Sequence, residues 1–314
     1  MAASVNRLVA VVGPTAAGKT ALALALARRF DGEIVGADSR QVYRHMDVGT
    51  AKPSQQEREL VRHHLIDVAD PDEEFSLGRF LDLAQAALAD IWSRRKRPFL
   101  VGGTGQYVWA LLEGWRVPKV PPRPQLRRRL EERAAREGND ALYEELRRID
   151  PQAAQIDRRN LRRVIRALEV YEATGRPLSF WRTREPPRFK TLVLGLSLPR
   201  RELYRRIDER VEAMVSRGLV AEVERLLALG YGRELPAMSG IGYREACQHL
   251  AGEIDLAAAA RRIETETHRL ARHQSNWFKR GDPRIRWIEA GEGTTEEAGR
   301  LVGEFLGLPQ AVSV

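Results

Sequence analysis

The sequence GPTAAGKT, residues 13–20, matches the pattern G-x-x-x-x-G-K-[ST] at every position. The continuous apolar run before it, RLVAVV at residues 7–12, predicts a buried strand, and the Ala/Leu-rich run at residues 19–30 predicts a helix. In a strand–loop–helix of this kind, backbone N–H groups and the positive helix terminus converge on a phosphate. The sequence therefore predicts a phosphate-binding loop at residues 13–20.

Every position of this loop belongs to the predicted phosphate and substrate site. Lys19 is expected to reach the outer phosphate oxygens, and the hydroxyl of Thr20 is expected to ligate Mg²⁺. The loop identifies a phosphate group but not the molecule that carries it, so ATP binding stays open. The other members of the site are Gly13, Pro14, Thr15, Ala16, Ala17 and Gly18.

Asp38 raises the question of which reaction the loop serves. An ATPase or GTPase of this class needs a second strand that ends in a metal-binding aspartate, and the predicted strand at residues 33–37 ends this way. Asp38 is followed at once by Ser39, Arg40 and Gln41, which all have hydrogen-bonding side chains. Two interpretations remain: Asp38 holds a metal ion, or the loop holds a diphosphate leaving group and Asp38 serves the acceptor.

Further strands and helices alternate along the chain. Strands are predicted at residues 98–101 and 191–196, and helices are predicted at residues 77–95 and 106–112. Such alternation is typical of a parallel sheet with helices on both faces, so we predict an α/β fold of the P-loop NTPase type. Beyond Arg200 the sequence is mostly helical in character.

A proline-rich segment, RVPKVPPR at residues 116–123, interrupts this pattern, and a strand-free, helix-rich segment follows at residues 125–174. We therefore predict an all-helical domain at residues 116–190, inserted into a catalytic core formed by residues 1–115 and 191–314. The chain has a net charge of +9, and residues 116–190 hold 20 Lys and Arg against 11 Asp and Glu. The excess positive charge lies in the insertion and predicts an anionic partner there.

Other features exclude several classes of site. The single cysteine, Cys247, rules out an internal disulfide and any multi-cysteine zinc site, and the six histidines lack the spacing of zinc ligands on a helix. The N-terminal apolar run is too short for a membrane span or a signal peptide. We expect a cytoplasmic, monomeric protein that does not associate with a membrane.

Five sequence blocks, taken in order, resemble the tRNA dimethylallyltransferase family, also called tRNA isopentenyltransferases or IPP transferases. The resemblance spans roughly residues 8–290 and implies a P-loop-type core with a helical insertion. It also implies transfer of a dimethylallyl group from dimethylallyl diphosphate to N6 of adenine 37 in the tRNA anticodon loop, with Mg²⁺ as cofactor. The blocks are GPTAAGKT (13–20), ADSRQVYRHMDVGTAKP (37–53), HHLIDVADPDEEFSLGRF (63–80), LVGGTGQYVWALLEG (100–114) and SGIGYRE (239–245).

The resemblance also implies roles for individual residues. Asp38 corresponds to the family's general base, which deprotonates the adenine amine, and Thr104 lies in the GGT motif near the reacting groups. Arg210, in RIDERVEAM, corresponds to an arginine that binds the diphosphate. The implied tRNA-binding residues are Asp38, Ser39, Arg40, Gln41, Thr104, Arg162, Arg163, Val164, Ile165, Arg166, Ser239, Gly240, Ile241, Gly242, Tyr243 and Arg244.

Competing functions could use the same loop. A small-molecule or nucleotide kinase would transfer a phosphoryl group from ATP, but it leaves the basic insertion without a role. A non-catalytic RNA-binding protein could use the loop as an ATP switch, and a related prenyltransferase could use free AMP as its acceptor. The resemblance favours tRNA modification, with the diphosphate of the prenyl donor rather than ATP in the loop.

Structural roles also compete with the functional ones. Asp38 could cap a turn, and the Thr104 side chain could cap the following helix. Residues 127–129 could form a solvated helix face balanced by Glu131 and Glu132. For three aromatic residues near the C-terminus we favour core packing over stacking on RNA bases. These are Trp277, Phe278 and Trp287.

Overall fold

The computed structural model describes residues 5–181 and 183–308. The chain divides into two compact units: a core unit, which runs to Leu112 and resumes at Pro187, and an insertion unit, Glu113–Pro186. These boundaries lie a few residues before 115/116 and 190/191, the positions predicted from the proline-bearing segments. Each unit buries an apolar cluster of its own.

Among the described residues of the core unit, six strands form one sheet in the order β3-β2-β4-β1-β5-β6, and every neighbouring pair is parallel. This confirms the predicted α/β fold. The central strands are continuous apolar runs because helices cover both of their faces, and residues 8–12 of β1 are almost completely buried. The strands are β1 Asn6–Val12, β2 Gly32–Gly36, β3 His63–His64, β4 Arg97–Gly102, β5 Phe189–Ser197 and β6 Ile285–Glu289.

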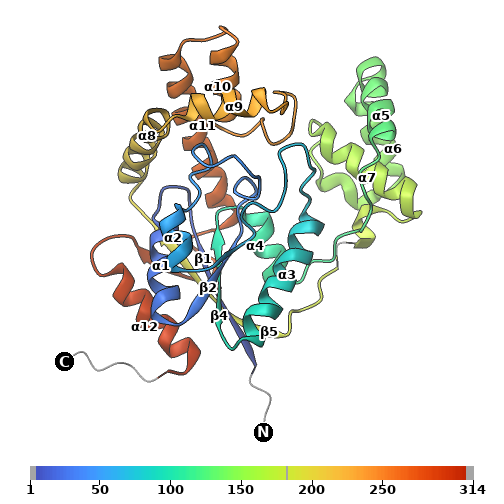
Figure 1. Cartoon of the computed structure of the whole chain (residues 1–314). Coiled ribbons are helices and arrows are strands. Elements are labelled where there is room, and N and C mark those ends of the chain that lie inside the picture. Colours follow the sequence, from blue (N-terminus) through green and yellow to red (C-terminus); the bar gives the residue numbers. More distant parts are fainter. Residues whose placement is uncertain (1–4, 182, 309–314) are drawn as a thin grey trace, which may run out of the picture. The chain divides into compact units, whose positions relative to one another are not determined.

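Two pairs of helices cover opposite faces of the sheet (Figure 1). One pair is α1 (Lys19–Arg29) with α12 (Thr294–Leu306), and the other is α3 (Leu77–Ser93) with α4 (Gly105–Leu112). The chain moves one way along the sheet from β1 through β2 to β3 and back from β3 to β4, so right-handed crossovers place α1 and α3 on opposite faces. The phosphate loop joins β1 to α1 and therefore lies at the carboxyl end of β1.

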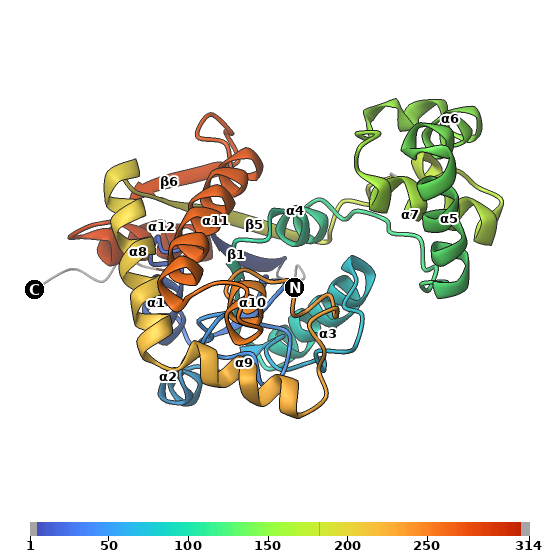
Figure 2. The same cartoon turned by 90° about the horizontal axis from the view of Figure 1, so that it is seen from above.

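Four helices after β5 lie beyond the end of the sheet at which β1 ends, as Figures 1 and 2 show. They enclose a second apolar cluster, to which the segment after β2 contributes Val42, Tyr43 and Met46. The polar segment that begins at Asp38 is therefore anchored on buried apolar side chains. The helices are α8 Arg200–Ser216, α9 Leu219–Ala228, α10 Tyr243–Leu250 and α11 Leu256–Trp277, and a short helix between β2 and β3 is α2 Gln55–Leu60.

The sequence patterns do not predict β6, the edge strand beside β5. Its residues, IRWIE, bury Ile285 and Ile288 but leave Arg286 and Glu289 exposed. A run this short and mixed has neither a helical nor a strand period. It is a strand because β5 offers it a parallel edge in continuous register.

The insertion unit is a bundle of three helices, α5 (Pro124–Glu137), α6 (Asn139–Ile149) and α7 (Leu161–Thr174), with short 3₁₀ helices η1 (Pro151–Gln155) and η2 (Leu178–Trp181). The segments that enter and leave this unit are joined by hydrogen bonds, because the Arg116 amide donates to the Thr183 carbonyl at 2.9 Å. No helix in the described parts of the chain is long and apolar enough to cross a membrane. The buried centre of the bundle includes Leu126, Leu130, Leu142, Leu146 and Val164.

A buried carboxylate holds α5 to α7. Glu169 on α7 is completely buried and accepts hydrogen bonds from the Arg123 amide at 2.8 Å, from Arg127 at 2.8 and 3.0 Å, and from Arg166 at 2.5 Å. Burial opposes ionisation of Glu169, but these hydrogen bonds outweigh it and lower the pKa to about 2. The prediction of a solvated face is therefore wrong for Arg127, which pairs inside the bundle.

Gly102→Ala should destabilise the core unit. A Cβ at Gly102 would lie 2.1 Å from the carbonyl oxygen of Ala37; Gly102 is the last residue of β4, and Ala37 directly follows the neighbouring strand β2. We expect the free energy of unfolding to fall by about 2–3 kcal/mol, measured as a lower midpoint of urea denaturation. Gly303→Ala is the matched control, because a Cβ there meets nothing within 4 Å and alanine favours the helix. Equal midpoints for the two variants would contradict this account.

Candidate functional site

The phosphate loop has the backbone conformation that an anion cradle needs. Gly13, Ala16 and Gly18 have φ angles of 140°, 62° and 92°. A Cβ at Gly13 would lie 2.5 Å from the carbonyl oxygen of Leu196 on β5, so this position requires glycine. Gly18 precedes α1 and has no side chain to satisfy the first-turn amides. These amides and the positive helix terminus are available to an anion.

Two cations lie at this loop without a carboxylate partner. Lys19 donates from Nζ to the Pro14 carbonyl at 2.7 Å, and Arg210 reaches the site from α8. In residues 5–181 and 183–308, neither side chain forms an ion pair or a hydrogen bond with a carboxylate. Burial lowers the pKa of Lys19 to about 8; the charge of Arg210 acts in the same direction, and Asp38 opposes it. Burial also lowers the pKa of Arg210, and the negative charge of Asp38 opposes this shift.

Asp38 follows β2 and faces the same site. Its Oδ1 accepts hydrogen bonds from the amides of Arg40 at 2.8 Å and Gln41 at 3.3 Å, so Asp38 does cap a turn. Its other carboxylate oxygen accepts no hydrogen bond from any described residue. The turn therefore fixes the direction of the carboxylate and leaves one oxygen free for another group.

Thr104 joins the ends of β2 and β4. Its hydroxyl accepts a hydrogen bond from the Ser39 amide at 3.1 Å, and its amide donates to the Ala37 carbonyl at 3.2 Å. The first-turn amides of α4, from Tyr107 and Val108, donate to the Thr104 carbonyl rather than to its hydroxyl. The side chain of Thr104 thus points toward the segment that carries Asp38.

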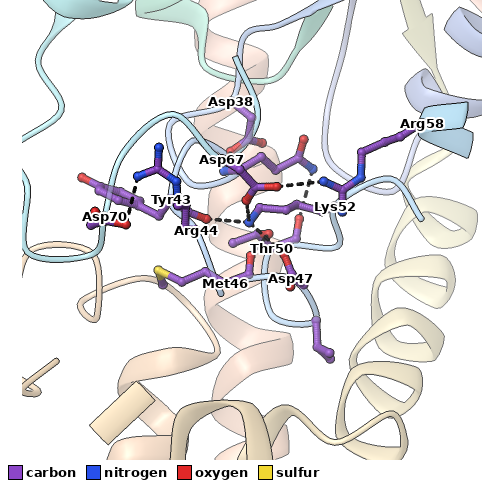
Figure 3. A network of polar contacts seen from close by, with 12 residues as sticks. Asp38, Tyr43, Arg44, Met46, Asp47, Thr50, Lys52, Arg58, Asp67 and Asp70 are labelled. Carbon is purple, nitrogen blue, oxygen red and sulfur yellow. Dashed lines mark hydrogen bonds and ion pairs between the residues drawn. The ribbon is translucent and has the colours of Figure 1, made fainter. Parts of the chain in front are cut away.

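Figure 3 shows the network of hydrogen bonds and ion pairs by which Lys52 holds the segment after Asp38 in place. The side chain of Lys52 is 1% exposed, and its Nζ donates to the Tyr43 carbonyl at 2.5 Å, to Asp47 at 2.8 Å and to Asp67 at 2.6 Å. Arg58 donates to the other oxygen of Asp67 at 2.8 Å. A buried charge is tolerated only when it is paired and hydrogen-bonded, and Lys52 meets both conditions.

A second buried charge, that of Glu222, holds the same segment. Glu222 on α9 is 3% exposed and accepts hydrogen bonds from the amides of Asp47, Val48 and Gly49 at 2.9, 2.8 and 3.1 Å. The hydroxyl of Tyr243 on α10 donates to it at 2.6 Å. Burial and the negative charge of Glu222 raise the pKa of Tyr243 well above its usual value. The segment is therefore fixed to α9 and α10.

Arg40 brings the SGIGYRE block to the same region. Its guanidinium donates to the carbonyls of Pro236 at 2.9 Å and Ala237 at 3.3 Å, just before that block. Ser239 is exposed, whereas the ring of Tyr243 is 1% exposed and faces Glu222. Other residues of the block are placed by the backbone or by neighbours: Gly240 lies against Arg40, Ile241 packs on the second apolar cluster, Gly242 has φ 94°, and Arg244 pairs with Glu245.

The predicted contacts at residues 162–166 lie in the insertion unit and differ in exposure. Arg162 and Arg163 are exposed at the start of α7. Val164 and Ile165 are buried in the helical bundle. Arg166 donates to Glu169 and, at 3.0 Å, to the Val120 carbonyl. Only the first two arginines therefore offer free guanidinium groups in this stretch of the described chain.

One acidic cluster lies elsewhere in the core unit. Ligand atoms of Glu33, His64 and Asp90 lie within 4.8 Å of one another, but the Arg94 guanidinium donates to Glu33 and Asp90 at 2.8 and 2.7 Å. The hydrogen bonds from Arg94 lower the pKa of Glu33 to about 2. Glu33 is near the start of β2 and Asp38 follows its end, a separation of about 16 Å along an extended strand. This cluster is neutralised by arginine and is separate from the phosphate loop.

Sequence reasoning missed Gln274. This residue is 8% exposed on α11, accepts a hydrogen bond from the Thr15 amide at 2.7 Å and donates to the Gly103 carbonyl at 3.2 Å. An isolated glutamine on an amphipathic helix gives no signal of such contacts. The nearby aromatic residues divide: Phe278 is buried as predicted, while Trp277 is 38% exposed and packs against Gly105.

Comparisons with known proteins point to one family. Residues 41–281 match the family described as IPP transferase, and residues 6–70 match the one described as isopentenyl transferase. A tRNA dimethylallyltransferase of Roseiflexus sp. (strain RS-1) is 57% identical over 274 residues, which cover 87% of this chain and 90% of the relative. Another, of Dehalococcoides mccartyi, is 45% identical over 300 residues, which cover 95% and 92%.

Solved structures of similar enzymes share the fold. A full-length tRNA isopentenylpyrophosphate transferase from Bacillus halodurans has a TM-score of 0.71 at 38% identity, covering 96% of this chain and 97% of that chain. A eukaryotic dimethylallyltransferase, solved acting on tRNA, has a TM-score of 0.82 at 28% identity, covering 97% of this chain and 80% of that chain. The likeness therefore extends over nearly the whole chain.

Glu222→Ala should destabilise the protein strongly. The change leaves three backbone amides and the Tyr243 hydroxyl without their acceptor, and each unsatisfied buried group costs about 1–3 kcal/mol. We expect the free energy of unfolding, from urea denaturation, to fall by at least about 3 kcal/mol. Glu224→Ala on the exposed face of the same helix should change it by less than about 0.5 kcal/mol. Similar losses in both variants would rule out the anchoring role of Glu222.

Lys19→Met should reveal what it costs to remove the charged lysine from water. This cost should appear as a difference in the free energy of unfolding between variant and parent that depends on pH. Because the pKa is about 8 in the folded protein against 10.5, the unfolded chain binds more protons between these values. The free energy of unfolding of the parent protein therefore rises as the pH increases through this range. Below the range, the parent carries the full cost of a buried, charged Lys19. We expect Lys19→Met to be more stable at pH 7, by on the order of 3 kcal/mol at most, and to lose this advantage toward pH 10.

Urea denaturation of both proteins at pH 7, 8.5 and 10 measures this difference. Lys279→Met, at an exposed position, is the matched control and should differ from the parent equally at all three pH values. A Lys19→Met difference that stays constant with pH would contradict the burial of a charged Lys19.

Proposed function

The chain belongs to the IPP transferase family, and we propose that it moves a dimethylallyl group from dimethylallyl diphosphate to N6 of adenine 37 in a tRNA anticodon loop. Its relatives of 45–57% identity are tRNA dimethylallyltransferases, and a related eukaryotic enzyme has been solved acting on tRNA. The chain is accordingly a tRNA-modifying prenyltransferase. The roles proposed for individual residues follow from the family resemblance and are supported by the geometry of the site.

The observation that carries the assignment is the pairing of two free cations with one free carboxylate oxygen. Lys19 and Arg210 have no carboxylate bonded to them in the described residues, and Asp38 couples electrostatically to both. The cations suit a departing diphosphate, whose negative charge grows as the bond to the allylic carbon breaks. The carboxylate suits an acceptor that must lose a proton.

The chemistry of the acceptor explains why a base is needed. The lone pair of an exocyclic adenine amine is delocalised into the ring, so the amine is a poor nucleophile. As N6 bonds to the allylic carbon, the carbon–oxygen bond to diphosphate breaks and the amine proton passes to Asp38. A well-placed base contributes about 10²–10⁴ in rate to such a step. The two phosphate-loop cations and the α1 terminus stabilise the leaving group.

The donor set at the loop fits Mg²⁺. Thr20 lies in the first turn of α1, and its hydroxyl forms no hydrogen bond with any described residue, so this hard oxygen ligand is free. Together with the diphosphate oxygens, Thr20 would hold the ion. When bound, Mg²⁺ would neutralise part of the charge on the leaving group.

The segment after Asp38 would receive the adenine. The Gln41 amide nitrogen donates to the carbonyls of Thr50 and Ala51 at 3.2 and 3.1 Å. The side-chain oxygen of Gln41 has no donor among the described residues and remains available to a base. An anticodon-loop base is unpaired, so its extrusion costs only a few kcal/mol.

The insertion unit would supply contacts to tRNA phosphates through its positive charge. Arg162 and Arg163 are exposed and unpaired at the start of α7, which suits phosphate contacts that position the RNA. We therefore propose that residues 116–190 bind tRNA. We also propose that the enzyme is a monomer and that it is cytoplasmic. The diphosphate of the donor, rather than ATP, is assigned to the loop.

Asp38→Asn should retain tRNA binding and lose turnover by about 10²–10⁴-fold, because the amide cannot accept the amine proton. The assay incubates enzyme with dimethylallyl diphosphate, Mg²⁺ and unmodified tRNA, and measures prenylated adenosine by mass spectrometry of the nucleosides. Asp72→Asn, at an exposed position outside the site, is the matched control and should keep parental turnover. Near-normal turnover of Asp38→Asn would refute the base assignment, and ATP turnover without prenylated adenosine would favour a kinase.

A further inference from the structure

One side chain connects the phosphate loop to the strand end that carries Thr104. Gln274 projects from the last turn of α11 and is 8% exposed. Its Oε1 accepts the Thr15 amide at 2.7 Å, and its Nε2 donates to the Gly103 carbonyl at 3.2 Å. Both ends of the amide are therefore used, and each end binds a different functional segment.

The neighbouring backbone is built around this side chain. A Cβ at Gly103 would lie 2.2 Å from Nε2 of Gln274, and a Cβ at Gly105 would lie 2.2 Å from Cγ of Trp277. The Trp109 ring donates from Nε1 to the Trp277 carbonyl at 2.9 Å, which fixes the end of α11 on α4. The glycines thus allow α11 to approach closely, and Gln274 has little freedom to move.

The contact with Thr15 affects the phosphate loop directly. Because the Thr15 amide donates to Gln274, it is not free to donate to a phosphate. The amides of Ala16 and Gly18, by contrast, have no acceptor among the described residues. Gln274 thus fixes the loop at Thr15 and leaves the amides of Ala16 and Gly18 free to bind an anion.

The contact with Gly103 continues to the general base. Thr104 follows Gly103, and its hydroxyl accepts the Ser39 amide beside Asp38. We propose that Gln274 is a positioning residue, which sets the gap between the diphosphate cradle and Asp38 across which the dimethylallyl group moves. This proposal rests on the function assigned above.

A loose gap has a specific chemical consequence. The allylic carbon gains carbocation character as the carbon–oxygen bond to diphosphate breaks, and water can take the place of N6. The water oxygen then bonds to that carbon, its proton passes to solvent, and dimethylallyl alcohol and diphosphate are released. A positioning defect should therefore raise hydrolysis of the donor relative to transfer, because near-attack geometry and exclusion of water both weaken.

Two substitutions separate the ends of the contact. Gln274→Leu removes both hydrogen bonds, whereas Gln274→Glu keeps an acceptor for the Thr15 amide but cannot donate to the Gly103 carbonyl. With tRNA and dimethylallyl diphosphate, we expect kcat for transfer to fall about 10–100-fold in Gln274→Leu and less in Gln274→Glu. The ratio of dimethylallyl alcohol to prenylated adenosine should rise several-fold in both. The affinity of Gln274→Leu for inorganic pyrophosphate should fall, and its affinity for tRNA should not change.

Ser275→Ala, the next residue on the exposed side of α11, is the matched control and should keep the parental ratio. Once the dimethylallyl alcohol formed without enzyme is subtracted, this ratio does not depend on how much of a variant is folded, so it can be interpreted even if Gln274→Leu is unstable. The positioning role would be overturned if the ratio is unchanged in both variants and any fall in the rate of transfer is explained by a smaller amount of folded protein. If the parent protein forms no prenylated adenosine at all, the proposed function fails instead, whatever the variants do.

Discussion

Lys19 and Arg210 share one site, and no described carboxylate bonds to either of them. Like charges held together in a medium of low polarity repel each other, so a structure that contains them must hold them by other contacts. Lys19 is fixed by a loop carbonyl, and Arg210 belongs to α8, which packs along α11. Elsewhere the pattern is different: Lys52 and Glu222 are buried among full sets of partners. The unbalanced pair at the phosphate loop is the exception, and a bound polyanion would relieve it.

Close approach of backbones gives the site its dimensions. The parallel sheet brings the carboxyl ends of β1, β2 and β4 side by side, and glycines allow their connecting segments to touch. Gly13 lies against Leu196, Gly102 against Ala37, and Gly103 against Gln274, each with no room for a Cβ. Flexible side chains alone could not keep the cradle and the acceptor segment at a fixed separation. The rigid ends of three strands provide the frame, since each strand is hydrogen-bonded along its length, and Gln274 connects the two segments across it.

Short-range sequence patterns predicted the elements whose structure is determined by neighbouring residues along the chain. The parallel sheet and the position of the phosphate loop followed from continuous apolar runs and one complete motif, and the sheet is confirmed. β6 did not follow, because its five residues become a strand only beside β5. Gln274 and Glu222 could not be predicted as anchors, because their partners are far away in the chain and no periodic pattern marks them. The mixed exposure of residues 162–166 was equally hidden, since a run of arginines does not tell which of them pairs inside a bundle.

The pairing inside that bundle changes how the positive charge of the insertion unit should be counted. Arg127 and Arg166 both pair with the buried Glu169, which offsets one of their two charges, and their side chains are 30% and 31% exposed. Each side chain that neutralises an RNA phosphate displaces roughly one condensed counterion. If the insertion unit binds tRNA as proposed, exposed and unpaired guanidinium groups such as those of Arg162 and Arg163 should contribute most to the salt sensitivity of binding. An electrostatic footprint taken from composition would overstate the number of ions released.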